Sequence, residues 1–195
     1  MTVELFLGGA RSGKSSYAEQ AALSYLAEQG RAARLHYIAT AIAFDDEMRK
    51  RIAHHQSRRG AEWHNHECPV ALAQKVAQLE AHDIVLIDCL TLWINNVIYN
   101  DGNTATPTEI RQQVEDLVEV LDACAATILC VSNEVGLGIV PLGEVSRLYV
   151  DHAGWMNQAI AKVASRVTFM AAGLPLILKD SQVDSTTSKG TCSER

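Results

Sequence analysis

Residues 8–15 read Gly8-Gly9-Ala10-Arg11-Ser12-Gly13-Lys14-Ser15 and match the pattern G-x-x-x-x-G-K-S without a mismatch. An apolar run at residues 3–7 precedes this loop, and a stretch with helical spacing follows it. Glycines let the backbone curl so that successive N–H groups face a phosphate, and the following helix adds the positive end of its dipole. The pattern therefore predicts a phosphate-binding loop in which Lys14 holds the β- and γ-phosphates and Ser15 places its hydroxyl on Mg²⁺.

Apolar strands alternate with helical segments along the rest of the chain. Strands are expected at residues 34–39, 84–88, 127–131, 166–171 and 174–178, and residues 62–66 are of uncertain type. Helices are expected at residues 14–28, 45–59, 70–80, 90–99, 107–125 and 143–164. This alternation predicts an α/β fold of the P-loop NTPase class, with a doubly wound, mostly parallel sheet that ends in an antiparallel hairpin.

Length and composition limit the classes of protein that the chain can belong to. The 195 residues are 48% hydrophobic and 21% charged, which predicts one catalytic domain over residues 1–179 and a disordered polar tail at 180–195. A net charge of −6 disfavours non-specific nucleic-acid binding. Neither a membrane-spanning run nor a signal-like start is recognisable, so we expect a cytoplasmic protein without membrane insertion.

Several side chains are better explained by packing than by chemistry. The five cysteines contain no C-x-x-C pair, and we interpret them as small buried hydrophobes. The three tryptophans are scattered, and we interpret them as core or interface residues. His64 and His66 fall on one face of an extended segment, but no third ligand is indicated nearby, so a zinc site is not favoured.

Four loops are expected to meet at one edge of the sheet. In doubly wound sheets, ligands bind beyond the carboxyl ends of the parallel strands. The sequence places the loop 8–15, the segment Ala39-Thr40, Asp88 and the glycine-containing loop 132–141 at such ends. Asp88 follows a buried strand, where a P-loop protein needs an acid that holds Mg²⁺, although it could instead cap the helix that starts near Leu90.

The segment 45–59 contains the most informative histidine. At helical spacing His55 joins the apolar stripe of Met48 and Ile52, whereas His54 points away from it. Five cationic side chains surround His55, namely Arg49, Lys50, Arg51, Arg58 and Arg59. They disfavour the imidazolium form, so a nucleophilic ring nitrogen stays available to attack a nucleotide phosphorus. The alternative is a histidine that is part of the core.

Taken together and in this order, these motifs resemble one enzyme family. They are the loop 8–15, Tyr37-Ile38-Ala39-Thr40, Asp45-Asp46-Glu47-Met48 with His54-His55, and Asn133-Glu134-Val135-Gly136 with Gly138-Ile139-Val140-Pro141. Over residues 3–179 the chain resembles the bifunctional adenosylcobinamide kinases / adenosylcobinamide-phosphate guanylyltransferases of cobalamin biosynthesis. The resemblance implies phosphorylation of adenosylcobinamide by a nucleoside triphosphate, GTP or ATP, and transfer of GMP from GTP to the resulting phosphate.

The resemblance also implies a set of site residues and an assembly. His55 would carry GMP covalently. Nucleotide contacts would map onto the loop 8–15 and onto Ala39, Thr40, Ala41, Gln56, Ser57, Arg58, Arg59, Glu67 and Asp88. The family further implies a RecA-like sheet and a homotrimer. Location of the corrinoid site is left open among Trp93, Trp155 and the loop 135–141.

Two other functions are compatible with the phosphate-binding loop. The chain could be a small-molecule kinase in which His55 is structural and no covalent intermediate forms. It could also be a nucleotide-controlled binding protein that hydrolyses GTP to change partners. Covalent labelling of the protein by GTP labelled at the α-phosphate would favour the bifunctional enzyme over the simple kinase. Stimulation of nucleotide consumption by adenosylcobinamide would count against the nucleotide-controlled binding protein.

Overall fold

The computed structural model describes residues 2–42, 60–100 and 103–181. In this part of the chain a seven-stranded sheet has the order β3-β2-β4-β7-β1-β8-β9. Its strands are β1 (Thr2–Gly8), β2 (Arg34–Ala39), β3 (Trp63–Glu67), β4 (Asp83–Asp88), β7 (Thr127–Val131), β8 (Arg166–Ala171) and β9 (Leu174–Asp180). All neighbouring pairs are parallel except β8 and β9, which form the antiparallel hairpin that the sequence predicts.

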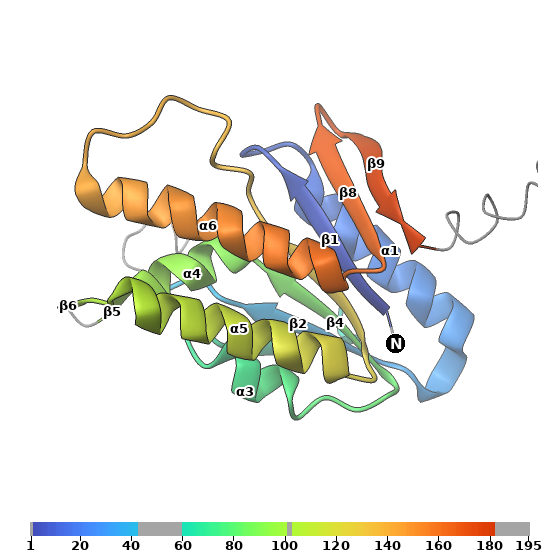
Figure 1. Ribbon diagram of the computed structural model, residues 1–195. Coiled ribbons are helices and arrows are strands. Elements are labelled where there is room, and N and C mark those ends of the chain that lie inside the picture. The colour runs from blue at the N-terminus through green and yellow to red at the C-terminus, as the bar shows by residue number, and fades with distance from the viewer. Residues whose placement is uncertain (1, 43–59, 101–102, 182–195) are drawn as a thin grey trace, which may run out of the picture.

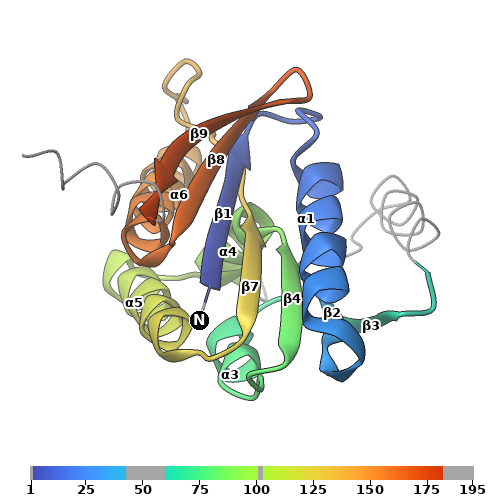
Figure 2. The ribbon, with the colours of Figure 1, turned by 90° about the vertical axis from the view of Figure 1, so that its right-hand side faces the viewer.

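Helices cover both faces of this sheet, as Figure 2 shows. The described helices are α1 (Lys14–Gln29), α3 (Leu72–Val76), α4 (Leu90–Ile98), α5 (Pro107–Ala123) and α6 (Glu144–Val163), with a short 3₁₀ turn η1 (Gly30–Ala32) after α1. Helix α1 packs on one face against Phe6, Leu35 and Leu86, whereas the other four cover the opposite face. The doubly wound α/β prediction is therefore confirmed.

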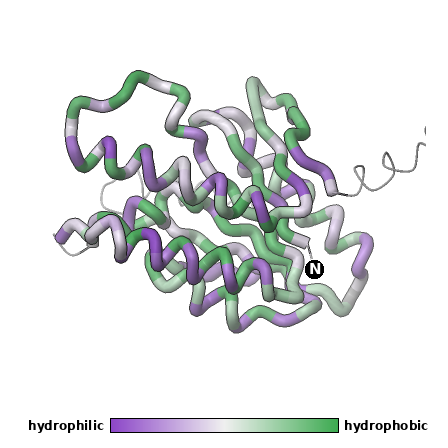
Figure 3. The backbone as a smooth tube through the Cα atoms, viewed as in Figure 1, coloured by the Kyte–Doolittle hydropathy of each residue, from purple (hydrophilic) through white to green (hydrophobic). Residues whose placement is uncertain are grey.

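The central strands are buried on both faces, which explains their nearly continuous apolar sequence. Every residue of β7 is buried, as are the first five of β4. Figure 3 shows hydrophobic residues along these strands and again in the loop 132–143, which joins β7 to α6. Helix α5 begins with the capping box that the sequence predicts: Thr106 accepts from the amide of Glu109, whose carboxylate accepts from the amide of Thr106.

The structure corrects one predicted helix and adds strands in two segments to which the sequence assigns none. The helix expected at 70–80 is reduced to Leu72–Val76, because the Val70 carbonyl accepts hydrogen bonds from the Leu72 amide and the Trp93 indole instead of continuing a helix. The uncertain segment 62–66 is the edge strand β3. After α4, which ends one residue before its predicted bound, β5 (Tyr99–Asn100) and β6 (Asn103–Thr104) form a two-residue ladder.

The carboxyl-terminal strand extends slightly beyond its predicted end. Strand β9 runs to Asp180, so the first residue of the predicted tail is paired in the sheet. The rest of that tail, residues 182–195, lies outside the described residues, as does the predicted helix 45–59. None of the described helices is both long and apolar enough to cross a membrane.

Candidate nucleotide site

The loop 8–15 leaves the carboxyl end of β1 and runs directly into α1 (Figure 1). Lys14 is the first residue of that helix, and its side chain is only 6% exposed. Its ammonium donates to the Gly9 carbonyl at 2.6 Å and to the Ser12 hydroxyl at 3.4 Å. The lysine therefore lies inside the curl of the loop, with its charge directed at the loop's own backbone.

Burial determines the electrostatics of this lysine. It lowers the pKa of Lys14 below its ordinary value, although the neighbouring Cys89 and Asp88 act in the opposite direction. A cation that is partly desolvated in this way gains stability from any further negative charge nearby. The loop is therefore suited to an anionic group bound next to Lys14.

Two segments from later in the chain donate backbone hydrogen bonds to the loop 8–15. The amide of Gly173, in the turn of the β8–β9 hairpin, donates to the Ser12 carbonyl at 3.0 Å. On the other side, the amide of Glu134 donates to the Gly8 carbonyl at 3.1 Å. Gly13 precedes the helix with φ 97°, a left-handed conformation that glycine adopts without strain. The loop is thus supported by segments that follow it by more than a hundred residues.

Asp88 stands at the same edge of the sheet, at the end of β4. Its carboxylate accepts a hydrogen bond from the Tyr37 hydroxyl at 3.2 Å. Ala39 is in register with both Asp88 and Glu67, so the ends of β2, β3 and β4 form one row. The structure therefore brings together the loop 8–15, Ala39, Glu67 and Asp88 at one edge.

The strand order relates this edge to known nucleotide-binding folds. One strand, β7, separates β1, which carries the loop, from β4, which carries Asp88. In doubly wound sheets of this kind, ligands bind beyond the carboxyl ends of the parallel strands. Asp88 and the Ser15 hydroxyl are hard oxygen donors of the kind that Mg²⁺ prefers, so the residues present fit this ion.

Beyond β7 the chain forms a buried polar cluster before it becomes exposed. Asn133 donates through its amide to the Thr91 hydroxyl at 2.8 Å, and its carbonyl accepts from Asn157 of α6 at 3.2 Å. Asn157 also accepts from the Ser132 hydroxyl at 2.7 Å. None of these roles is signalled by a sequence motif, because each depends on packing between segments that are distant in the chain.

Most other side chains that the sequence assigned to packing are buried. Trp63 and Trp93 lie in the core, whereas Trp155 is 46% exposed and stacks beneath the Arg111 guanidinium at 4.5 Å. The described cysteines, Cys68, Cys89, Cys124 and Cys130, are all free and buried, as predicted. In contrast, the loop after Asn133 exposes large apolar side chains, including Ile139 and Leu142, each 98% exposed.

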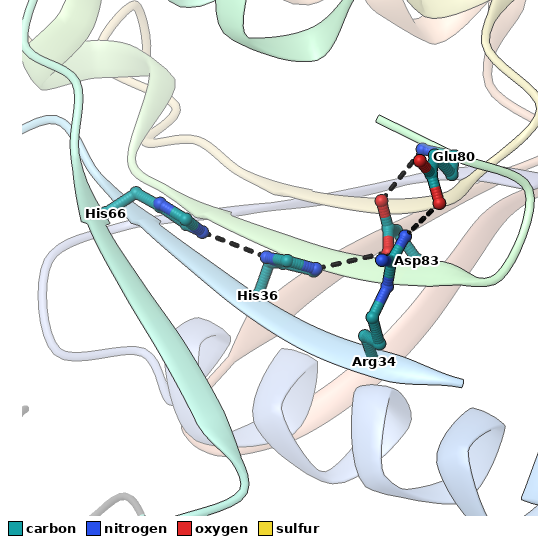
Figure 4. Close-up of polar contacts among 5 residues, drawn as sticks. All are labelled: Arg34, His36, His66, Glu80 and Asp83. Atoms are coloured by element: carbon teal, nitrogen blue, oxygen red, sulfur yellow. Dashed lines mark hydrogen bonds and ion pairs between the residues drawn. The ribbon is translucent and has the colours of Figure 1, made fainter. Parts of the chain in front are cut away.

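One histidine of β3, His66, belongs to a chain of hydrogen bonds that includes His36 of β2 (Figure 4). His36 lies between Asp83, 3.1 Å from its Nε2, and His66, 2.9 Å from its Nδ1. Because the Asp83 carboxylate accepts at Nε2, a neutral His36 accepts at Nδ1 from His66. Asp83 also binds Arg34, which pairs with Glu80. The described residues contain no group of three or more potential metal ligands.

This histidine chain makes stability depend on pH. Burial lowers the pKa of His36 and of His66, and Lys75 and the other imidazoles lower that of His66 further. The unfolded chain takes up protons near pH 6.5, whereas the folded protein does so only at lower pH. The free energy of unfolding is therefore expected to decrease as pH falls below about 6.5, by at most about 1.4 kcal/mol per pH unit for each histidine.

Urea unfolding at a series of pH values between neutral and about 5 measures this decrease. The His66→Gln variant should show a smaller decrease than the parent protein. The matched control is His82→Gln, because His82 lies at an exposed position outside the hydrogen-bonded chain. Equal slopes in the parent and in His66→Gln would contradict the prediction.

The remaining predicted site residues lie outside the described part of the chain. They are His55, Gln56, Ser57, Arg58 and Arg59. Only their connection to the site is known: the segment that carries them links the end of β2 to the start of β3. Both strands end at the row formed by Ala39 and Glu67, next to Asp88.

Comparison with known proteins gives consistent matches over nearly the whole chain. A family model described as "Cobinamide kinase / cobinamide phosphate guanyltransferase" matches residues 4–178. The chain is 51% identical to the "Bifunctional adenosylcobalamin biosynthesis protein CobP" of Pseudomonas aeruginosa, covering 90% of this chain and 96% of that protein. It is 36% identical to the "Bifunctional adenosylcobalamin biosynthesis protein CobU" of Salmonella typhimurium, covering 90% and 98%. A KaiC-like protein from Pyrococcus horikoshii aligns at 14% identity, with a TM-score of 0.49 and coverage of 86% and 70%.

Proposed function

Because the chain belongs to the cobinamide kinase / cobinamide phosphate guanyltransferase family, we propose that it carries out both reactions on adenosylcobinamide. It phosphorylates the substrate's aminopropanol hydroxyl from GTP or ATP, and it then transfers GMP from GTP to the new phosphate. The observation that carries this proposal is the buried Lys14 inside its loop, close enough to Asp88 for that carboxylate to raise the pKa of the lysine.

In the kinase step, Lys14 and the amides of the loop 8–15 hold the β- and γ-phosphates. The substrate's alcohol oxygen bonds to the γ-phosphorus while the bond to the β–γ bridging oxygen breaks, and the alcohol proton is lost to solvent. Ser15 and Asp88 would hold Mg²⁺, which neutralises phosphate charge when bound. The segment 39–41 and Glu67 share the edge with Asp88 and are proposed to face the nucleoside.

In the guanylyl step, His55 is the proposed nucleophile. Its ring nitrogen bonds to the α-phosphorus of GTP, and the bond to the α–β bridging oxygen breaks, which releases pyrophosphate. An oxygen of adenosylcobinamide phosphate then displaces His55 from the phosphorus and yields adenosylcobinamide-GDP. This assignment is supported by the apolar stripe and the cationic neighbours that the sequence places around His55.

The covalent intermediate provides a direct test. GTP labelled at the α-phosphate should leave acid-labile, base-stable label on the denatured protein, as expected for a phosphoramidate. The His55→Ala variant should lose this label by at least about 10²-fold, because the proposed bond to phosphorus is made by the ring nitrogen that the substitution removes. His54→Ala is the matched control, since helical spacing predicts that the neighbouring histidine points away from the apolar stripe, and it should be labelled like the parent.

The outcomes separate the competing functions. A parent protein that stays unlabelled but phosphorylates adenosylcobinamide would be a kinase without a covalent intermediate. Full labelling of His55→Ala would show that another residue is the nucleophile. GTP hydrolysis that adenosylcobinamide does not stimulate would instead favour a nucleotide-controlled binding protein.

We also propose that residues 1–179 form one catalytic domain and that the enzyme works as a cytoplasmic homotrimer. The cytoplasm supplies the nucleoside triphosphates that both steps consume. Exposed apolar side chains on the hairpin strand β9 support subunit contacts: Leu174, Leu176 and Leu178 are 70%, 59% and 57% exposed. Strand β9, which carries these residues, and β3 are the two opposite edge strands of the sheet.

A further inference from the structure

Thr40 directly follows β2, and it is completely buried at the edge where the nucleotide is proposed to bind. Its hydroxyl donates to the Cys89 carbonyl at 2.6 Å and accepts from the Cys89 amide at 2.9 Å. One side chain therefore bonds to both backbone polar groups, the N–H and the C=O, of Cys89, the residue that follows Asp88. This one hydroxyl thus contacts the main chain directly after Asp88 on both the amide side and the carbonyl side.

The main chain of Thr40 is tied to the same region. Its amide donates to the Asp88 carbonyl at 3.3 Å. Its carbonyl accepts from the side-chain amide of Asn96 at 2.8 Å, and the same amide group donates to the Pro69 carbonyl at 3.0 Å. Each polar group of Thr40 thus already has a partner within the protein. Such buried and fully paired groups hold a defined geometry, because breaking any one bond leaves a desolvated polar atom.

A residue of β2, Tyr37, bonds to the Asp88 carboxylate itself. The Tyr37 hydroxyl donates to one carboxylate oxygen at 3.2 Å, and the tyrosine is 5% exposed. Its ring packs edge-on against Trp63, with ring centroids 6.3 Å apart. The aromatic contact restricts the direction of the hydroxyl, so one oxygen of Asp88 is directed towards β2.

We propose that Tyr37 and Thr40 form a clamp that positions Asp88 for the metal–phosphate group, and that the Thr40 side chain acts through Asp88 instead of touching the nucleotide. This inference rests on the proposed function, in which Asp88 holds Mg²⁺. It gives Thr40 a more specific role than the nucleotide contact implied by the family resemblance. Tyr37 and Thr40 are positioning residues in this scheme.

Nucleotide binding with and without the metal distinguishes a positioning role from direct contact. The probe is α,β-methylene-GTP, which cannot transfer GMP, and its affinity is measured by calorimetry in Mg²⁺ and in EDTA. Thr40→Val keeps the size of the side chain and removes the hydroxyl. We expect an affinity in Mg²⁺ about tenfold weaker than that of the parent, because partners outside the ligand shell typically contribute at least this much. The affinity in EDTA should stay within about twofold.

Three further variants sharpen the test. Thr40→Ser restores the hydroxyl and should recover the affinity in Mg²⁺. Tyr37→Phe keeps the ring against Trp63 but removes the donor to Asp88, so it should also lose affinity only in Mg²⁺; it tests the clamp even if Thr40→Val fails to fold. Thr127→Val is the matched control, because Thr127 is a buried threonine at the opposite end of the sheet.

Backbone exchange gives a second readout that needs no ligand. The Cys89 amide loses its acceptor in Thr40→Val and should exchange its hydrogen faster than in the parent, whereas Thr40→Ser should protect it. Slow exchange in Thr40→Val would overturn the clamp.

The binding outcomes also separate the clamp from the proposed function. Equal weakening of Thr40→Val in Mg²⁺ and in EDTA would identify Thr40 as a direct contact and overturn the clamp alone. Affinities equal to those of the parent in both Thr40→Val and Tyr37→Phe would also overturn the clamp but leave the proposed function intact. A parent protein that binds no nucleotide in either condition would refute the proposed function and the clamp together.

Discussion

Replacing Lys14 with alanine is expected to lower the rates of both the kinase and the guanylyl reaction by about 10³-fold. Both steps require the triphosphate chain to be held in the loop 8–15, and Lys14 is the buried cation inside that loop. Separate assays of adenosylcobinamide phosphorylation and of pyrophosphate release measure the two rates. A loss confined to the kinase step would show that the guanylyl reaction uses a different phosphate site.

Folding of this variant should be preserved. Burial lowers the pKa of Lys14, so removal of the charged group relieves a desolvation cost. Thermal unfolding should therefore show no large loss of stability, which separates the effect on catalysis from an effect on folding. The control is Lys162→Ala, at an exposed position near the end of α6, which should retain both activities.

Replacing Gly8 with alanine is expected to destabilise the fold by about 3 kcal/mol or more and to reduce activity with it. Gly8 has φ +147°, outside the range that other residues adopt readily. A Cβ at this position would lie 2.3 Å from the Met170 carbonyl oxygen and 2.8 Å from the Ser12 hydroxyl. Neither the backbone of β8 nor the loop can move away without breaking the pairing of β1.

Urea unfolding of the variant measures this loss. Gly9→Ala is the matched control for stability, because an added Cβ there meets no heavy atom within 4 Å. We expect its free energy of unfolding to stay within about 1 kcal/mol of the parent value. A Gly8→Ala protein as stable as Gly9→Ala would mean that the approach of β8 to the loop is not as close as the structure has it.

The predicted elements that match the structure have strong local signals. Strands β2, β7 and β8 have the predicted bounds, because each is a mostly apolar stretch with polar or helix-forming residues on both sides. Helix α5 starts where its capping threonine and proline require. Segments without such signals were predicted less well. The polar strand β3, which reads Trp63-His64-Asn65-His66-Glu67, gains its extended form from pairing with β2.

The same distinction applies to the candidate site. A pattern of eight residues identifies the loop 8–15, and the end of a buried strand identifies Asp88, so both could be found without coordinates. Asn96 and Thr91 could not, because they sit inside apolar segments and their hydrogen-bond partners are far away in the chain. Tyr37 belongs to a motif, but its bond to Asp88 likewise depends on the pairing of distant strands. Thr40 was expected at the edge, but only its contacts show that its hydroxyl is directed at Cys89.

The class of fold, the phosphate-binding loop and the family can all be identified from the sequence, since each depends on short patterns that local chemistry enforces. The coordinates were needed to find which strands are neighbours, how the hairpin turn and Glu134 bond to the loop, and how Tyr37 and Thr40 bond to Asp88. These two groups of features differ in the range of the interactions that produce them. Backbone conformation and helix capping act over a few residues, whereas the bonds that shape the site join segments that meet only after the sheet has formed.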